Sequence, residues 1–139
     1  MQQLAEFAGN HVLLMLGLLG SFALVATYEL RQRMHGVLQV SPGDAVRLIN
    51  RSAVIVDVRD PEAFNAGHIV NARNLTLADI EKDPDALKKN KSKVVLTVCD
   101  SGAQSGKAAT LLRKAGYDNT FSLRGGIAAW RAENLPLAK

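Results

Sequence analysis

The chain has 139 residues, of which 47% are hydrophobic and 22% are charged, and it carries one cysteine and a net charge of +4. A single cysteine excludes an intramolecular disulfide framework and is typical of a protein from a reducing compartment. The length predicts one domain of ordinary core size. The basic excess is small and lacks clustered arginine and aromatic residues, which argues against a nucleic-acid partner.

Residues 9–28 form an uncharged, apolar segment near the N-terminus, with nine Leu, Val and Phe residues between Val12 and Val25. A helix of this length, at about 1.5 Å per residue, extends roughly 30 Å, the thickness of the hydrocarbon core of a bilayer. The segment therefore predicts a transmembrane helix in contact with membrane lipid. We expect it to lie in an N-terminal anchor and linker of residues 1–36.

Two other interpretations fit this segment less well. A cleaved signal peptide usually begins with basic residues, but Glu6 is the only charged side chain before the segment, and the small-residue pattern Ser21-x-Ala23 falls inside it. A buried core helix would show one apolar stripe, whereas apolar residues surround this one. Gly17 and Ser21 form a small-xxx-small pair, which offers contact with another membrane protein, although lipid contact is the default.

Basic residues follow the segment and none precedes it: Arg31 and Arg33 come directly after it, with His35 beside them. The positive-inside rule then predicts a single-pass protein of the inner (cytoplasmic) membrane, with its N-terminus outside and its C-terminal domain in the cytoplasm. Residues 36–39 are the expected connection to the next element. A connection this short would keep the domain close to the membrane.

Residues 37–139 have the pattern of an α/β domain. Ser41, Pro42 and Asp44 predict the start of a helix, with Ser41 as its N-cap. Residues 94–98 are apolar without alternation, which predicts a strand covered on both faces of a parallel sheet. The remaining pattern predicts strands at 37–40, 53–58, 72–75 and 120–123, helices at 42–50, 61–66, 107–115 and 126–130, and two short surface helices within 76–90.

The cysteine, Cys99, stands at the carboxyl end of the strand expected at 94–98 and is followed by a Gly and Ser loop and a helix. Ligands of open α/β sheets bind at this edge, where the next helix presents free N–H groups and a partial positive charge. A thiolate, or an anion that it attacks, would be stabilised there. The alternative is that Cys99 is a small buried hydrophobic residue without chemistry.

The sequence does not match the motifs of a phosphatase loop, a nucleotide-binding loop or a metal site. Ser105 stands where the C-x5-R loop of tyrosine phosphatases needs the arginine that grips phosphate. Ala108 stands where a Walker A loop needs Ser or Thr after Gly-Lys. His68 has no second His or Cys nearby, so no metal site is predicted and a loop-bracing hydrogen bond is its default role.

A second group of charged residues, which includes Asp57 and Arg59, follows the strand expected at 53–58. The carboxyl end of a strand is where a functional site is expected in this class of sheet. The alternative is a structural pair in which the two side chains bind each other and cap loops.

Three groups of residues, taken together, resemble the rhodanese family over about 100 residues, 37–137. The first is Asp57-Val-Arg59 with Phe64 and Gly67-His68-Ile69, the second is Cys99-x-Ser-Gly102-x-Gln-Ser105, and the third is Gly125-Gly126-Ile-x-x-Trp130 with Leu135-Pro136. The resemblance implies a five-stranded, mainly parallel sheet flanked by helices. The loop from Cys99 to Gln104 has the length used by sulfur-handling members, whereas related phosphatases and arsenate reductases use a longer one.

The resemblance also implies a function: Cys99 would accept a sulfane sulfur atom from a donor, hold it as a persulfide and pass it to an acceptor thiol or protein. No metal or organic cofactor is implied. Asp57, Arg59 and His68 would support the site. The loop that binds the anionic sulfur would consist of Asp100, Ser101, Gly102, Ala103, Gln104 and Ser105.

Two loop residues depart from the family pattern: Gln104 stands where many active members carry Arg, and Asp100 where a basic or neutral residue is common. The first loses a fixed positive charge, and the second disfavours the thiolate and repels thiosulfate. Asn71 also replaces a glycine that usually follows the His-Ile step. We therefore expect weak activity towards thiosulfate and a protein persulfide or another thiol as donor. The cations that can compensate are Arg59, Arg73, Lys107 and Arg124.

A hypothesis from a different class is a membrane-tethered docking module that uses the same fold to bind a protein partner and has little or no catalysis. The short tether and the acidic loop favour docking. The intact Cys99 with its Gly and Ser loop favours the enzyme.

Overall fold

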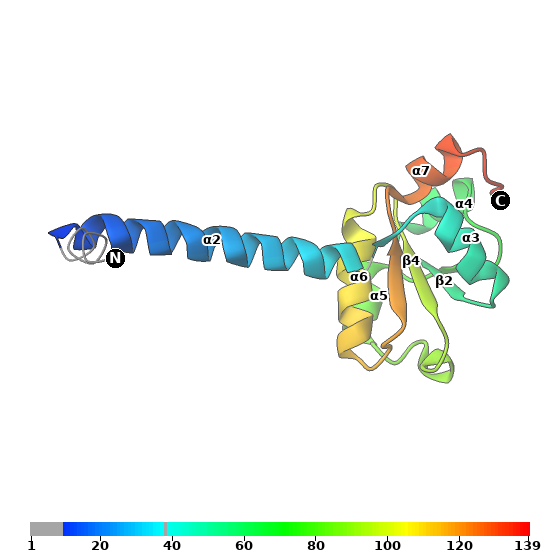
Figure 1. Ribbon diagram of the computed structural model, residues 1–139. Helices are drawn as coiled ribbons and strands as arrows, with labels where there is room; N and C mark the ends of the chain where they lie inside the picture. The colour runs from blue at the N-terminus through cyan, green and yellow to red at the C-terminus, as the bar shows by residue number, and fades with distance from the viewer. Residues whose placement is uncertain (1–9, 38) are drawn as a thin grey trace. The chain divides into compact units, whose positions relative to one another are not determined.

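The computed structural model describes residues 10–37 and 39–139 and divides the chain after Val37 into two units (Figure 1). The first unit contains one long helix, and the second is an α/β domain with its own core. The N-terminal tail of residues 1–8, residue 9 of the predicted span and residue 38 of the predicted first strand lie outside the described residues.

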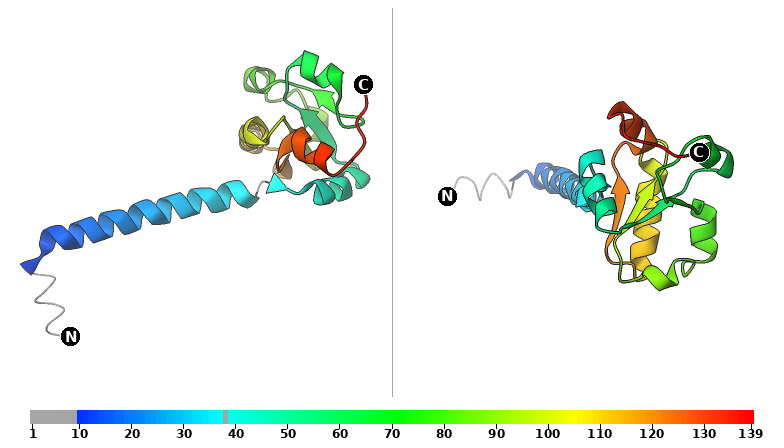
Figure 2. Two further views of the ribbon diagram at one scale, coloured as in Figure 1. Left: turned by 90° about the horizontal axis from the view of Figure 1, so that it is seen from above. Right: turned by 90° about the vertical axis from the view of Figure 1, so that its right-hand side faces the viewer.

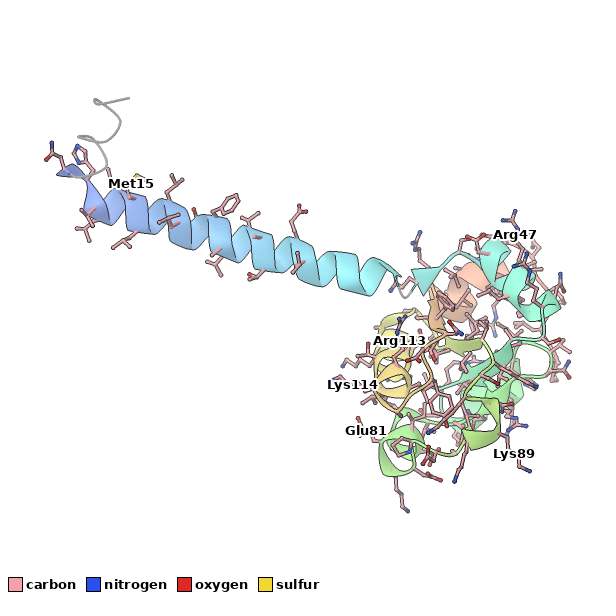
Figure 3. The ribbon with its side chains drawn as sticks, turned by 60° about the horizontal axis from the view of Figure 1, so that its bottom comes forward. Met15, Arg47, Glu81, Lys89, Arg113 and Lys114 are labelled. Carbon is pink, nitrogen blue, oxygen red and sulfur yellow. The ribbon has the colours of Figure 1, made fainter. Side chains whose placement is uncertain are left out.

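The helix of the first unit is α2 (Val12–Val37), and its part up to residue 30 carries apolar side chains on opposite sides (Figure 3). Its Val, Leu, Phe and Tyr residues between Val12 and Leu30 are 57–85% exposed. Residues 12–30 have a mean hydropathy of 1.8 and form one helix that is long and apolar enough to cross a membrane, within the part of the chain that the structure describes.

The helix also extends further than the sequence pattern predicts. Residues 36 and 37 belong to α2, so the prediction of a connection that begins at residue 36 and of a strand that begins at residue 37 is wrong. No proline interrupts residues 29–37, and a glycine near the end of a helix is tolerated at a modest cost. The first strand, β1 (Gln39–Val40), is correspondingly short.

The α/β domain is built on a five-stranded sheet in which every neighbouring pair of strands is parallel. This arrangement confirms the predicted fold class. Strands β2 (Val54–Asp57) and β4 (Val95–Val98) are central, and all four residues of β4 are buried because both faces of the sheet are covered. The strand order is β1-β5-β4-β2-β3, with β3 at Arg73–Asn74 and β5 at Thr120–Leu123.

Helices cover both faces of the sheet (Figure 2). One core cluster packs α3 and α7 against strand residues that include Ile55 and Leu96, and the other packs α5 and α6 against Val56 and Val95. The side chains of neighbouring strand residues point to opposite faces, so one apolar run fills both clusters. The helices are α3 (Pro42–Asn50), α4 (Pro61–Ala66), α5 (Leu77–Lys82), η1 (Lys88–Asn90), α6 (Ala103–Lys114) and α7 (Gly126–Ala132).

Three predicted helix starts, at residues 42, 61 and 126, are confirmed, and one is wrong. The Ser41 side chain accepts a hydrogen bond from the Asp44 N–H, as the sequence predicts, and α4 begins at Pro61. Helix α6 begins at Ala103, four residues before the predicted start at Lys107. The reason is Gly102, whose left-handed conformation (φ 98°) turns the chain into the helix directly after the cysteine loop.

Candidate active site

Cys99 follows β4 directly and is 2% exposed. The Gly102 N–H donates a hydrogen bond to its Sγ at 2.9 Å, and the Ser105 Oγ lies 3.4 Å from the same sulfur. Gly102 is the N-cap of the 12-residue helix α6. The sulfur therefore lies at a helix N-terminus, where a backbone donor and the helix dipole both stabilise a thiolate.

The first turn of α6 offers further backbone donors beside the sulfur. The first hydrogen bond of the helix runs from the Gly106 N–H to the Gly102 carbonyl at 3.3 Å. The N–H groups of Ala103, Gln104 and Ser105 precede this bond and have no acceptor within the helix. Three of the predicted loop residues thus lie in a helical turn, an arrangement that suits the binding of an anionic sulfur.

Buried hydroxyl groups fix this turn against the sheet. The Ser105 Oγ lies 2.8 Å from the Ser122 Oγ, and the Thr97 hydroxyl donates to the Ser105 carbonyl at 2.8 Å. Thr97 and Ser122 are register partners in β4 and β5. Neither residue is among those predicted from the sequence to form the site. The sequence feature that could have identified them is a small polar residue within each apolar strand.

A second glycine turn holds the cysteine loop from its other side. The Ile127 N–H donates to the Cys99 carbonyl at 2.8 Å, and the Ala128 N–H donates to the Asp100 carbonyl at 3.2 Å. Gly126 has φ 59°, and a Cβ added to it would overlap the Cys99 carbonyl oxygen. Residue 126 must therefore be glycine for the two segments to approach this closely.

Asp57 and Arg59 form a buried ion pair, with side chains that are 1% and 4% exposed. The Arg59 Nη2 donates to the Asp57 Oδ2 at 2.7 Å and to the Gly67 carbonyl at 2.7 Å, and its Nε donates to the Asp57 Oδ1 at 3.0 Å. Hydrogen bonding to Asp57 is the main cause that raises the pKa of Arg59 above its ordinary value. This geometry fits the alternative that Asp57 and Arg59 are a structural pair whose side chains bind each other.

The same guanidinium reaches the cysteine loop. Its Nη1 lies 3.6 Å from the Oδ1 of Asp100, whose side chain is 77% exposed. This distance describes an ion pair rather than a hydrogen bond. Arg59 is therefore the candidate cation that lies beside Asp100, and within the described residues Arg73, Lys107 and Arg124 make no ion pair with it.

His68 braces the connection that follows α4. Its Nδ1 lies 2.9 Å from the Phe64 carbonyl, and its ring stacks on Phe64 with centroids 3.9 Å apart. Its backbone exchanges hydrogen bonds with Ala138 at 2.9 and 2.7 Å. The described part of the chain contains no group of three or more His, Cys, Asp or Glu residues placed to hold a metal ion.

The remaining predicted loop residues, Ser101, Ala103 and Gln104, have exposed side chains. The site thus consists of a buried sulfur, a helix N-terminus whose Gly102 N–H binds that sulfur, and the exposed carboxylate of Asp100 at its edge. Such a site suits covalent chemistry on sulfur at the carboxyl edge of a parallel sheet.

The family model for the rhodanese-like domain matches residues 41–133 of this chain. The chain belongs to the rhodanese-like domain family. Its sequence is 36% identical to YibN of Escherichia coli over 141 residues, which is all of this chain and 99% of that protein. It is 37% identical to the thiosulfate sulfurtransferase GlpE of Pseudomonas entomophila over 97 residues, which is 68% of this chain and 84% of that protein.

Solved structures show the same fold. A rhodanese-related protein from Thermoplasma volcanium superposes with a TM-score of 0.66 at 25% identity, covering 72% of this chain and 96% of that one. The BH2092 protein of Bacillus halodurans superposes with a TM-score of 0.64 at 29% identity, covering 81% of this chain and 85% of that one.

Proposed function

We propose that this protein is a membrane-anchored sulfurtransferase that moves a sulfane sulfur atom through a persulfide on Cys99 to a thiol acceptor. The observation that carries the proposal is the hydrogen bond from the Gly102 N–H to the Cys99 Sγ at the N-terminus of α6. Relatives named thiosulfate sulfurtransferase, at 37% and 38% identity, support the same reaction class.

The proposed reaction has two steps. The Cys99 thiolate attacks the outer sulfur of a donor, the sulfur–sulfur bond of the donor breaks, and the leaving group departs with the bonding electron pair as sulfite or a thiolate. An acceptor thiolate then attacks the terminal sulfur of the Cys99 persulfide. This second attack breaks the new sulfur–sulfur bond, releases the acceptor as a persulfide and restores the Cys99 thiolate.

The backbone of the loop stabilises the charged states of these steps. The Gly102 N–H binds the sulfur, and the N–H groups of residues 103–105 lie in the first turn of the same helix, so these donors are held in place before any donor molecule arrives. Such fixed donors need no reorganisation when negative charge moves onto the terminal sulfur. Asp57, Arg59 and His68 support this geometry through their contacts with the neighbouring segments.

Helix α2 is the proposed membrane anchor. Its residues 12–30 have a mean hydropathy of 1.8, and their Val, Leu, Phe and Tyr side chains are exposed. The Ser21 hydroxyl donates to the Leu18 carbonyl, and the Thr27 hydroxyl donates to the Ala23 carbonyl, each at 2.9 Å. These two hydroxyl groups are therefore satisfied within the helix, as hydrocarbon requires. We further propose a cytoplasmic domain, because the basic residues lie only on the C-terminal side of the span.

The sulfur-transfer proposal is tested with the full chain in detergent, beside its Cys99→Ser variant. Incubation with thiosulfate, followed by mass spectrometry, should show one added sulfur atom on the unmodified chain and none on the variant. Transfer to cyanide should likewise disappear in the variant. Equal background rates in both proteins, with no added sulfur from thiosulfate or an organic persulfide, would overturn the proposal.

The membrane proposal needs its own test, because the buried thiol of Cys99 is a poor target for a bulky, membrane-impermeant labelling reagent in either compartment. Lys139 is exposed, so a Lys139→Cys substitution in the Cys99→Ser background supplies an accessible thiol. In intact cells a membrane-impermeant thiol reagent should leave it unlabelled until the membrane is opened. Labelling before that point would place the domain outside.

A second candidate function is docking of a protein partner. An apolar hollow of about 210 Å³ lies between α3 and α7, lined by residues that include Val46, Ile49 and Trp130. Val70 at its edge is 47% exposed, although it is a large hydrophobic residue. Crosslinking in membranes through a photoreactive residue at position 70 should capture a defined partner if this function holds, and recovery of no partner would remove its support.

A further inference from the structure

Arg59 uses most of its hydrogen-bonding capacity on the domain itself. Its Nε and Nη2 bind Asp57, and its Nη2 also binds the Gly67 carbonyl. An arginine side chain has five N–H donors, of which two belong to Nη1. The Nη1 end faces the cysteine loop and has Asp100 as its ionic partner there. This end is the part of Arg59 that an anionic sulfur donor would use.

Asp100 covers that end of Arg59 only loosely. The separation of 3.6 Å between the Arg59 Nη1 and the Asp100 Oδ1 is too long for a strong hydrogen bond, and the Asp100 side chain is 77% exposed. Its backbone is held, since the Asp100 carbonyl accepts a hydrogen bond from the Ala128 N–H. The carboxylate therefore stays at the rim of the site, one residue after the nucleophile, whether or not the ion pair is closed.

We propose that Asp100 determines which sulfur donors this site accepts, by covering Arg59 and by placing a negative charge beside Cys99. Free dianionic donors such as thiosulfate meet a carboxylate where they would need a cation. A persulfide with a positive charge near its reacting sulfur gains an attraction at the same position. The favoured substrate class is thus a cationic persulfide. The inference rests on the proposed function and names the substrate class of that site.

The favoured step is the transfer already described, with a different donor. The Cys99 thiolate attacks the outer sulfur of an aminoalkyl persulfide, the sulfur–sulfur bond of the donor breaks, and the aminoalkyl thiolate leaves with the electron pair. The proton of the donor persulfide remains on the terminal sulfur or passes to the leaving thiolate. No oxidant or reductant is required, because one sulfane sulfur moves between two thiolates.

The test compares two small donors of opposite charge, thiosulfate and aminoethyl persulfide, on the full chain and on its Asp100→Asn variant. The matched control is Asp118→Asn, which removes one exposed carboxylate from the turn that precedes β5. Asp100→Asn should raise kcat/KM for thiosulfate by about threefold to tenfold, mainly through KM, because one like charge near the reacting atoms is removed. It should lower kcat/KM for aminoethyl persulfide, and Asp118→Asn should change neither.

Sulfate gives a readout that does not depend on turnover. It shares the tetrahedral anionic form of thiosulfate but carries no sulfane sulfur, so it should become a stronger competitive inhibitor in Asp100→Asn if Arg59 is uncovered. An unchanged donor ratio and unchanged sulfate inhibition in a folded variant would overturn the inference alone. Failure of both donors to load sulfur onto Cys99 in the unmodified chain would overturn the proposed function, and this inference with it.

Discussion

The backbone N–H of Gly102 points at the Sγ of Cys99 from 2.9 Å, three residues further along the chain. This contact depends on the left-handed conformation of Gly102, which closes the loop and starts α6 in one step. The sulfur and the helix N-terminus are thus positioned by the same residue. The chemistry proposed for the site is therefore most sensitive to substitutions that move this turn.

Gly102→Ala should reduce sulfur transfer by more than tenfold and lower the free energy of unfolding by about 1–2 kcal/mol, because a side chain is strained at φ 98°. Its Cβ would also lie 3.2 Å from the Gly125 N and 3.3 Å from the Leu123 carbonyl oxygen. Thermal unfolding and persulfide formation measure the two effects. The control is Gly106→Ala in the same helix, where a Cβ meets nothing within 4 Å and helix propensity favours alanine. A Gly102→Ala variant as active as the control would refute the argument.

Ser105→Ala should lower the rate of persulfide formation by roughly tenfold, because it removes a hydroxyl 3.4 Å from the sulfur and leaves the Ser122 hydroxyl buried without this partner. A stability loss of about 1–2 kcal/mol is expected for the same reason. Stopped-flow loading from a persulfide donor reports the first effect, and denaturant unfolding reports the second. Ser92→Ala, at an exposed position in the turn before β4, should change neither quantity. Unchanged loading in Ser105→Ala would exclude this hydroxyl from the chemistry.

Arg59→Met should destabilise the domain by about 3–5 kcal/mol, since it leaves the Asp57 carboxylate buried without its cation. The double variant Asp57→Asn with Arg59→Met removes that charge and should recover part of the loss. Arg47→Met provides a contrast, because the Arg47–Asp44 pair is exposed (80% and 56%) and should contribute little. Urea unfolding of the four proteins checks the ranking. A double variant less stable than Arg59→Met would show that the buried charge is not the cause.

Tyr117→Phe should protect the domain at alkaline pH. Tyr117 is fully buried, its hydroxyl has no hydrogen-bond partner among the described residues, and burial raises its pKa above the ordinary value of 10.0. The unfolded chain therefore loses this proton at lower pH than the folded chain does. Stability should fall as the pH rises from the ordinary tyrosine pKa towards the folded-state pKa.

The phenylalanine variant removes this contribution and should show a shallower alkaline decline. At neutral pH it should be as stable as the parent or slightly more stable, because an unpartnered buried hydroxyl is lost. Unfolding free energies between pH 7 and 11 supply the comparison, with the pH limits set at roughly three units below and one above the ordinary pKa. Parallel curves for the two proteins would show that Tyr117 does not contribute to alkaline unfolding.

The sequence by itself determined the class of fold and the position of the nucleophile. Residues 94–98 have no alternation because both faces of β4 are covered, and Ser41 and Pro42 mark a helix start through local chemistry. The glycines at 102 and 126 were visible in the sequence for a similar reason, since backbone conformation and close approach restrict those positions to one residue type. Such features depend on residues close together in the chain, so they can be recognised without knowledge of the tertiary contacts.

Only the tertiary structure decided which distant residues meet at the site. Ser122 joins Ser105 because β5 pairs with β4, and the Ile127 N–H reaches the Cys99 carbonyl because α7 packs beside the loop. The sequence offered four cations as partners for Asp100, and the fold placed Arg59 there by fixing its guanidinium on Asp57. The residue type determines the charge of a side chain, but the position of that charge depends on packing between segments far apart in the chain.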